Sequence, residues 1–257
     1  MQNYTIKLRI KNNRLRINKK CISLHPKMAN DYFRFKKFTI RQGRAAMKVG
    51  TDGTLLGAWA RGGASVLDVG TGTGLIALMM AQRCPGAAVL GIDVDASAVA
   101  EALDNVAASP FAGRVRVVQA DFRSFRGGPF DALVCNPPFF EQSLTCPDAQ
   151  RTLARHASQL SYRDLMEAAW SVLADDGELS VVIPFDCRQR LEQEAFLAGF
   201  FKSRECGVRT TPRKPVRRYL LAFRKHAGPT ELTEAVLETA PGERSAWYQE
   251  LTNEFYL

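Results

Sequence analysis

The sequence predicts an α/β protein with a doubly wound, mostly parallel sheet. Apolar segments of strand length alternate with longer segments of helix length between residues 64 and 200, a pattern typical of repeated βαβ units. A glycine-rich stretch, residues 70–74, joins the first of these strands directly to a helix. The following strands end in acidic or amide side chains, and open parallel sheets bind ligands at the carboxyl ends of their strands. We expect seven strands, with an antiparallel hairpin at the C-terminal side.

The chain is long enough for one large domain of this class, at 257 residues. Residues 1–48 are strongly basic, with fourteen Lys or Arg against the single acid Asp31. We interpret residues 1–30 as a basic N-terminal extension, either a disordered arm or a marginal strand. We expect residues 31–257 to form a single domain that opens with a short basic segment, residues 31–60. We further hypothesise that Met28 is an alternative start and that residues 1–27 are dispensable.

A short stretch near the start of the domain alternates aromatic and basic residues, namely Phe33, Arg34, Phe35, Lys36, Lys37 and Phe38. This alternation predicts a short strand or hairpin with one apolar and one basic side. Aromatic rings interleaved with cations suit single-stranded nucleic acid, and the same pattern suits a hairpin packed on the domain. Residues 50–53 then break the chain, and we expect a helix over residues 54–60.

The first strand of the alternation, residues 64–69, leads into a run of three glycines, Gly70, Gly72 and Gly74, and a helix over residues 75–82. Glycine lets the backbone turn sharply and approach a ligand closely, and the helix N-terminus offers unpaired N–H groups. The dinucleotide-binding pattern would require a further glycine at Leu75, so it is not met. Asp68 precedes the turn and either contacts the ligand or braces the loop.

Acidic residues follow the next two strands. Asp93 ends the strand over residues 88–92, where a carboxylate can bind both hydroxyl groups of a ribose. Asp95 is the alternative candidate for this role. Asp121 and Phe122 follow the next strand in the same way. We therefore expect these side chains to gather at one edge of the sheet.

The fourth strand, residues 130–135, ends in the tetrapeptide Asn136, Pro137, Pro138 and Phe139. Neither proline can donate a ladder hydrogen bond, so the strand stops there. The Asn136 amide oxygen and the Pro137 carbonyl can accept the two N–H bonds of a planar amine, and Phe139 can stack on its ring. The tetrapeptide therefore predicts a site for a planar NH₂ group.

The rest of the chain completes the alternation. Residues 140–160 are loop-like and carry Arg151, Arg155 and His156, which suit either substrate contacts or a solvated loop. We expect the remaining helices over residues 96–107, 162–173 and 191–200, the remaining strands over residues 114–120 and 178–183, and a basic hairpin of strands over residues 206–209 and 218–223.

The net charge of +9 is concentrated in two basic segments on an otherwise acidic body. This placement predicts a polyanionic partner that binds residues 31–48 and 202–225. Neither the three histidines nor the six cysteines show metal-ligand spacing, and no apolar run is long enough to span a membrane. We therefore expect a cytoplasmic monomer that uses no metal and contacts no membrane.

Several of these motifs resemble those of a known family. The run from Asp68 to Gly74 resembles the first motif of class I S-adenosylmethionine-dependent methyltransferases, and residues 136–139 resemble the Asn/Asp-Pro-Pro-Tyr/Phe signature of those that methylate amino or amide nitrogens. The run Met-Lys-Val-Gly-Thr-Asp-Gly at residues 47–53 is most similar to the bacterial tRNA-valine adenine-N6 methyltransferases. This similarity extends over residues 31–257, and residues 1–27 have no counterpart that we identify.

The resemblance implies a Rossmann-like class I methyltransferase fold with S-adenosylmethionine as cofactor. It assigns the cofactor to Lys48, Thr51 and Asp52 at the methionine end, Asp68, Gly70, Gly72 and Gly74 at the glycine turn, Asp93 at the ribose, Asp121 and Phe122 at the adenine, and Asn136 beside the methyl group. The catalytic residues that it implies are Asn136, Pro137 and Phe139.

The function expected from this resemblance is methylation of the exocyclic N6 of adenosine in tRNA. In the family the target is the adenosine directly after the anticodon, position 37 of tRNA(Val), and the two basic segments would contact that tRNA. One alternative is a protein methyltransferase acting on a release-factor glutamine, because an amide presents the same planar NH₂ group. A second alternative is an RNA-binding protein that keeps the fold without turnover.

Overall fold

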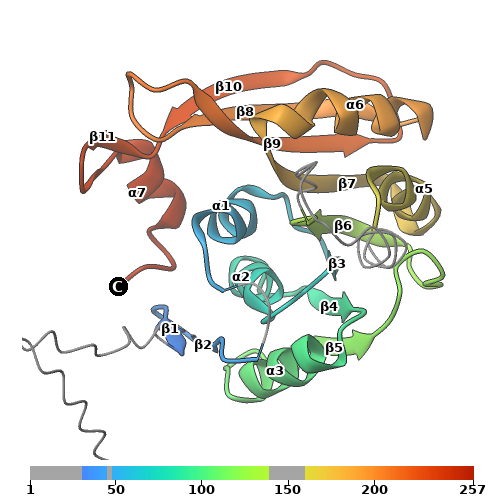
Figure 1. Cartoon of the computed structure of the whole chain (residues 1–257). Helices are drawn as coiled ribbons and strands as arrows, with labels where there is room; N and C mark the ends of the chain where they lie inside the picture. Colours follow the sequence, from blue (N-terminus) through green and yellow to red (C-terminus); the bar gives the residue numbers. More distant parts are fainter. Residues whose placement is uncertain (1–30, 45–47, 139–159) are drawn as a thin grey trace, which may run out of the picture. The chain divides into compact units, whose positions relative to one another are not determined.

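A twisted eight-stranded sheet forms the centre of the structure, a computed structural model that describes residues 31–44, 48–138 and 160–257 (Figure 1). Five strands, β3, β4, β5, β6 and β7, pair in parallel, and β9 joins them antiparallel to β7. From one edge to the other the order is β10 (Glu231–Val236), β8 (Phe201–Arg209), β9 (Val216–Arg224), β7 (Leu173–Pro184), β6 (Phe130–Cys135), β3 (Ser65–Val69), β4 (Ala88–Asp93) and β5 (Val115–Gln119).

The predicted fold class is confirmed, but the sheet has one strand more than the seven expected. The additional strand is β10, which pairs in parallel with β8 at the edge of the sheet. Its residues are mostly exposed, and Ala235 is the one buried position. A strand of this kind has no apolar run in its sequence, because it is held by its backbone ladder rather than by side-chain burial.

Helices cover both faces of the sheet (Figure 1). One face carries α1 (Thr51–Trp59), α2 (Leu75–Arg83) and α3 (Ala96–Ala107), and the other carries α5 (Tyr162–Val172) and α6 (Arg188–Leu197). Two apolar cores result, one on each face of the sheet. In β6, Leu133 belongs to one core and its neighbours Ala132 and Val134 to the other, which explains why this strand reads as a continuous apolar run.

Helix α1 begins three residues earlier than expected, so the predicted break at residues 50–53 is wrong. Gly50 precedes the helix with an extended backbone, and Gly53 lies inside it. A Cβ atom at Gly53 would lie 3.2 Å from Leu75 Cδ2, so glycine at this position allows α1 to pack closely on α2. As a consequence, Thr51 and Asp52 lie in the first turn of a helix rather than in a loop.

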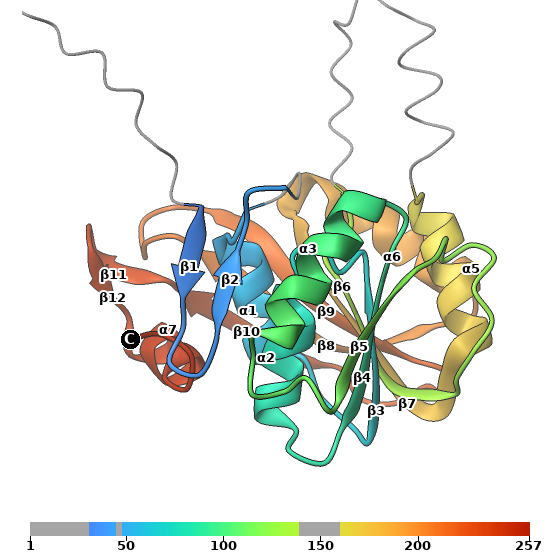
Figure 2. The same cartoon turned by 90° about the horizontal axis from the view of Figure 1, so that it is seen from below.

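The aromatic and basic stretch forms a hairpin of β1 (Tyr32–Arg34) and β2 (Thr39–Arg41). Phe35 and Phe38 are 1% and 4% exposed and pack in the core, so these rings are not available to stack on nucleic acid. The hairpin lies beside the C-terminal segment that contains α7 (Ala246–Thr252), and the Lys36 N–H donates to the Phe255 carbonyl (Figure 2). The packed-hairpin interpretation is therefore the correct one.

The remaining elements are short. They are the 3₁₀ helix η1 (Phe185–Cys187) and the small hairpin of β11 (Glu238–Ala240) and β12 (Glu243–Arg244). No helix in the described residues has the length and apolar character needed to cross a membrane.

Candidate cofactor and substrate site

The glycine turn between β3 and α2 has the backbone conformation that only glycine adopts freely. Gly70, Gly72 and Gly74 have φ angles of +70°, +55° and +80°. A Cβ atom at Gly70 or Gly72 would have no side chain within 4 Å, so the backbone at these two residues faces open space. The two residues line the cavities described below, whereas Gly74 is the N-cap of α2 and packs against Ala102.

Asp68 lies beneath this turn and lines neither cavity. Its side chain is fully buried, and Oδ2 accepts hydrogen bonds from Thr71 Oγ1 at 2.7 Å and from Ala77 N at 3.0 Å. Burial raises the pKa of this carboxyl group from its ordinary value of 3.8 to about 7, although the two hydrogen bonds act in the opposite direction. The geometry is that of a side chain that braces the turn and the first turn of α2.

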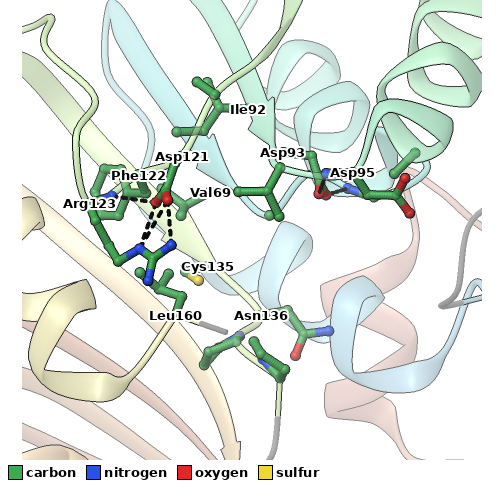
Figure 3. A pocket seen from close by; sticks show the side chains of 17 residues that line it. Val69, Ile92, Asp93, Asp95, Asp121, Phe122, Arg123, Cys135, Asn136 and Leu160 are labelled. Atoms are coloured by element: carbon green, nitrogen blue, oxygen red, sulfur yellow. Dashed lines mark hydrogen bonds and ion pairs between the residues drawn. The ribbon is translucent and has the colours of Figure 1, made fainter. Parts of the chain in front are cut away.

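Two adjacent cavities share the glycine turn and Asn136. The first, of about 260 Å³, extends past the ends of β4 and β5 and is lined by Asp93, Asp121 and Phe122 (Figure 3). The second, of about 250 Å³, extends toward the start of α1. Because β3 connects outward to β4 while β6 lies on its other side, the shared residues sit where the strand order reverses, the usual ligand position in doubly wound sheets.

The two acids after β4 make different hydrogen bonds within the protein. Asp93 Oδ2 accepts the Gly72 N–H at 2.9 Å, and its Oδ1 accepts the Asp95 N–H at 3.0 Å. Asp95 is the N-cap of α3, accepting from both N and Oγ of Ser97 at 2.8 Å, and these hydrogen bonds hold its pKa below the usual range. Asp93 therefore holds the glycine turn and Asp95 caps α3, and both carboxylates line the first cavity.

Asp121 and Phe122 lie across the first cavity from Asp93 (Figure 3). The Asp121 carboxylate accepts 3.0 Å hydrogen bonds from the Arg123 side chain, which lowers the pKa of Asp121. Phe122 is 3% exposed and lies on the wall of the cavity. Arg123 lines the same cavity and holds the Asp121 carboxylate in place. This residue was not identified from the sequence.

Asn136 stands where the two cavities meet, directly after β6. Its Oδ1 is buried and has no hydrogen-bond partner among the described residues. Pro137 and Pro138 line the first cavity beside it. A buried amide oxygen without a partner is costly, so an N–H donor from a ligand would relieve an unfavourable state of the protein. Phe139, the remaining predicted catalytic residue, lies outside the described residues.

Lys48, Thr51 and Asp52 line the second cavity together with one residue that the sequence analysis missed, Arg218. Arg218 belongs to β9, and its Nε lies 2.9 Å from Asp52 Oδ1. This ion pair joins the C-terminal part of the sheet to the start of α1. The basic run in β9 pointed to Arg218 as a charged residue. Its pairing with Asp52 could not be predicted, because it depends on how β9 packs against α1.

Most cations of the predicted basic segment 202–225 are bound to acids of the protein itself. Glu178 is 3% exposed and pairs with Arg204 at 2.6 Å and with Arg224 at 3.2 Å. The other paired cations are Lys202 with Glu192 and Glu205, Arg209 with Glu234, and Arg218 with Asp52. Within the described residues, Arg213, Lys214 and Arg217 are exposed and form no ion pair.

These features fit the cofactor that the resemblance implied. The glycine turn leaves room for a close ligand, carboxylates stand on two walls of the first cavity, and Lys48 and Arg218 supply positive charge in the second. A parallel sheet with this turn, and with acids at the ends of β4 and β5, defines a class I methyltransferase.

Comparisons with known proteins agree with this class. The family model described as "Methyltransferase small domain" matches residues 53–211. A solved structure of a predicted O-methyltransferase from Agrobacterium tumefaciens superposes with a TM-score of 0.58 at 19% identity, covering 79% of this chain and 96% of that one. A ribosomal protein L11 methylase from Lactobacillus delbrueckii superposes with a TM-score of 0.51 at 21% identity, covering 73% and 84%. These two superpositions show a shared fold alone.

Closer relatives identify the family. A tRNA1(Val) (adenine(37)-N6)-methyltransferase from Bacteroides thetaiotaomicron is 42% identical over 234 residues, or 90% of this chain and 99% of the relative. The enzymes of the same name from Tolumonas auensis and Trichodesmium erythraeum are 38% and 39% identical, again over 90% of this chain. The chain belongs to the tRNA1(Val) (adenine(37)-N6)-methyltransferase family.

Proposed function

We propose that this protein transfers the methyl group of S-adenosylmethionine to N6 of an adenosine in tRNA, namely position 37 of tRNA(Val), the target named for its relatives. The observation that carries the proposal is the buried Oδ1 of Asn136, which has no hydrogen-bond partner in the described part of the chain and lies where two cavities meet. Family membership supports the substrate, and the site supports the chemistry. We further propose that the enzyme works in the cytoplasm as a monomer.

The cofactor would lie across both cavities. Asp93 would bind the ribose, while Asp121 and Phe122 would contact the adenine in the first cavity. Lys48, Thr51 and the Asp52–Arg218 pair would hold the methionine end in the second. Asp68 would act indirectly, because it keeps the glycine turn in shape. S-Adenosylmethionine, when bound, supplies an electrophilic methyl group on a positively charged sulfur.

The target amine is a poor nucleophile because its lone pair is delocalised into the adenine ring. Asn136 Oδ1 and the Pro137 carbonyl would accept its two N–H bonds, which favours a pyramidal nitrogen with a directed lone pair. Positioning and charge stabilisation then account for the rate. The N–C bond forms as the S–C bond breaks and S-adenosylhomocysteine leaves. No strong base is needed before this transfer, because the nitrogen becomes acidic once it is methylated and can release its proton to water.

Transfer of labelled methyl from S-adenosylmethionine tests the proposal. Wild-type protein is incubated with total tRNA or with a release factor, and the tRNA product is digested to nucleosides. We expect label in tRNA as N6-methyladenosine and none in the release factor. Label in the release factor alone would support the protein glutamine methyltransferase instead. Cofactor binding measured by calorimetry separates a third case, because a protein that binds no S-adenosylmethionine would be an RNA-binding protein without turnover.

A further inference from the structure

An exposed aromatic ring stands next to the site at the carboxyl end of β7. Phe185 follows Pro184 at the start of η1 and is 53% exposed. It belongs to neither apolar core of the described residues. Its ring is stacked against the Tyr219 ring at a centroid distance of 6.0 Å. A single exposed ring is common on protein surfaces, so what distinguishes Phe185 is where it lies relative to Asn136 and to the cations of β9.

The sheet order places the end of β7, where Phe185 follows, between the end of β6, where Asn136 follows, and the start of β9 with its unpaired cation Arg217. β6 and β7 are parallel neighbours with Cys135 opposite Val181, so Asn136 and Phe185 follow the ends of adjacent parallel strands. On the other side of β7, Pro184 pairs with Arg218 of antiparallel β9. Phe185 comes directly after Pro184 and Arg217 directly before Arg218, so the two residues lie on the same side of this pair. Phe185 lines neither cofactor cavity, so it is available to another ligand.

The turn between β8 and β9, residues 210–215, emerges at this same end of the sheet, because Arg209 pairs with Val216. It carries Arg213 and Lys214, and Arg217 follows at the start of β9. These three exposed cations are the members of the basic segment 202–225 named above as forming no ion pair. Cations that are not neutralised by the protein are free to neutralise phosphates.

We propose that Phe185 and the cations Arg213, Lys214 and Arg217 form the RNA-docking surface, with the Phe185 ring stacking on a base next to the target adenosine and the cations contacting the backbone phosphates. This inference rests on the proposed function and extends it to the substrate. A ring beside a row of cations is the arrangement that binds single-stranded RNA, since every base has a face to stack and every linkage carries a charge. The paired cations Lys202, Arg204, Arg209 and Arg224 hold the protein together instead.

Two sets of variants test this surface. Arg213→Ala/Arg217→Ala removes two of its charges, and Arg116→Ala/Arg126→Ala is a matched control. Arg116 and Arg126 are also exposed arginines outside ion pairs in the described residues, near the start of β5 and just before β6. Phe185→Ala removes the ring, Phe185→Leu keeps an apolar side chain without a ring, and Phe185→Tyr keeps the ring.

The measurements are kcat and KM for tRNA over a range of salt concentrations, calorimetric affinity for S-adenosylmethionine, and the melting temperature of each variant. We expect the Arg213/Arg217 variant to raise KM for tRNA, and the slope of log KM against log salt to become shallower by about one to two units. Phe185→Ala and Phe185→Leu should raise KM about tenfold. Phe185→Tyr and the control should stay near wild type, and cofactor affinity should not change.

The outcomes separate the two proposals. If wild-type protein methylates tRNA while the Arg213/Arg217 and Phe185→Leu variants behave like the control, the docking surface is wrong and the function stands. If wild-type protein transfers no methyl group to tRNA, the proposed function fails and the docking surface fails with it. Should Phe185→Ala melt early through loss of the Tyr219 contact, the comparison of Phe185→Leu with Phe185→Tyr still distinguishes stacking from packing.

Discussion

The Asn136 side chain presents an acceptor to a space that two cavities share, and no described residue supplies it with a donor. Replacement by alanine should lower kcat for tRNA methylation by about 10² to 10³, the usual effect of removing one preorganised polar contact from the transition state. Asn136→Asp keeps an acceptor in place, so we expect it to retain more activity than the alanine variant. Calorimetry with S-adenosylmethionine should show that both variants still bind cofactor. Turnover of Asn136→Ala near the wild-type rate would refute the role assigned to this residue.

Asp68 gives the free energy of unfolding a pH dependence that can be measured. Burial raises its pKa from 3.8 to about 7 in the folded protein, so between about pH 4 and 7 the folded chain retains a proton that the unfolded chain releases. The stabilisation from this proton is complete below about pH 4 and is lost as the pH rises through 7. The total change is at most a few kcal/mol, because each pKa unit corresponds to about 1.4 kcal/mol.

The variant Asp68→Asn has no carboxyl group to titrate, but it keeps an oxygen that can accept from Thr71 and Ala77. Denaturant unfolding of both proteins at several pH values isolates the effect of Asp68. We expect wild type to lose stability relative to Asp68→Asn from about pH 4 to 7 and the difference to be constant above that range. Parallel stability curves over the whole range would show that Asp68 titrates normally.

At the scale of elements, one ion pair connects β9 to the first turn of α1 beside the second cavity. Arg218 and Asp52 are 24% and 29% exposed in their side chains, so the pair is partly screened and contributes on the order of 1 kcal/mol. Arg218→Ala should therefore weaken S-adenosylmethionine binding about fivefold through the loss of this support and of a positive charge. Arg218→Lys should recover part of the affinity, since it keeps the charge without the planar guanidinium.

The matched control for Arg218→Ala is Arg213→Ala. Arg213 is exposed and lines neither cavity. We expect this control to bind the cofactor as wild type does, by calorimetry. Equal cofactor affinity in Arg218→Ala and Arg213→Ala would mean that the ion pair stabilises the fold without supporting the cavity.

For the molecule as a whole, the sequence predicted the parts of the site that depend on local order along the chain. Asp93, Asp121 and Asn136 were found because each directly follows an apolar strand, and parallel strands bring such positions to one edge. Arg218 was assigned only to the basic segment 202–225 and Phe185 to no role, because their neighbours are set by antiparallel pairing with another strand. The ion pairs of Arg204 and Arg224 could not be predicted for the same reason, since their common partner Glu178 lies in another strand.

We predict that residues 1–27 are dispensable for folding and for activity. The described part already contains the whole eight-stranded sheet, both cavities and the hairpin that begins at Tyr32. The Bacteroides relative matches 90% of this chain but 99% of its own length, so about a tenth of this chain has no counterpart there. A shortened chain that begins at Met28 should therefore keep the wild-type melting temperature and the wild-type rate of tRNA methylation.

A second shortened chain, which begins at Gln42, provides the contrast. It loses Phe35, Phe38 and Ile40, which are 1%, 4% and 0% exposed, and removal of a large buried side chain costs about 2 to 5 kcal/mol. Since a domain of this size is stabilised by only about 5 to 15 kcal/mol in total, this chain should melt far below wild type or fail to fold. A comparable loss in the chain that begins at Met28, in melting temperature or in methyl transfer, would show that residues 1–27 belong to the working enzyme.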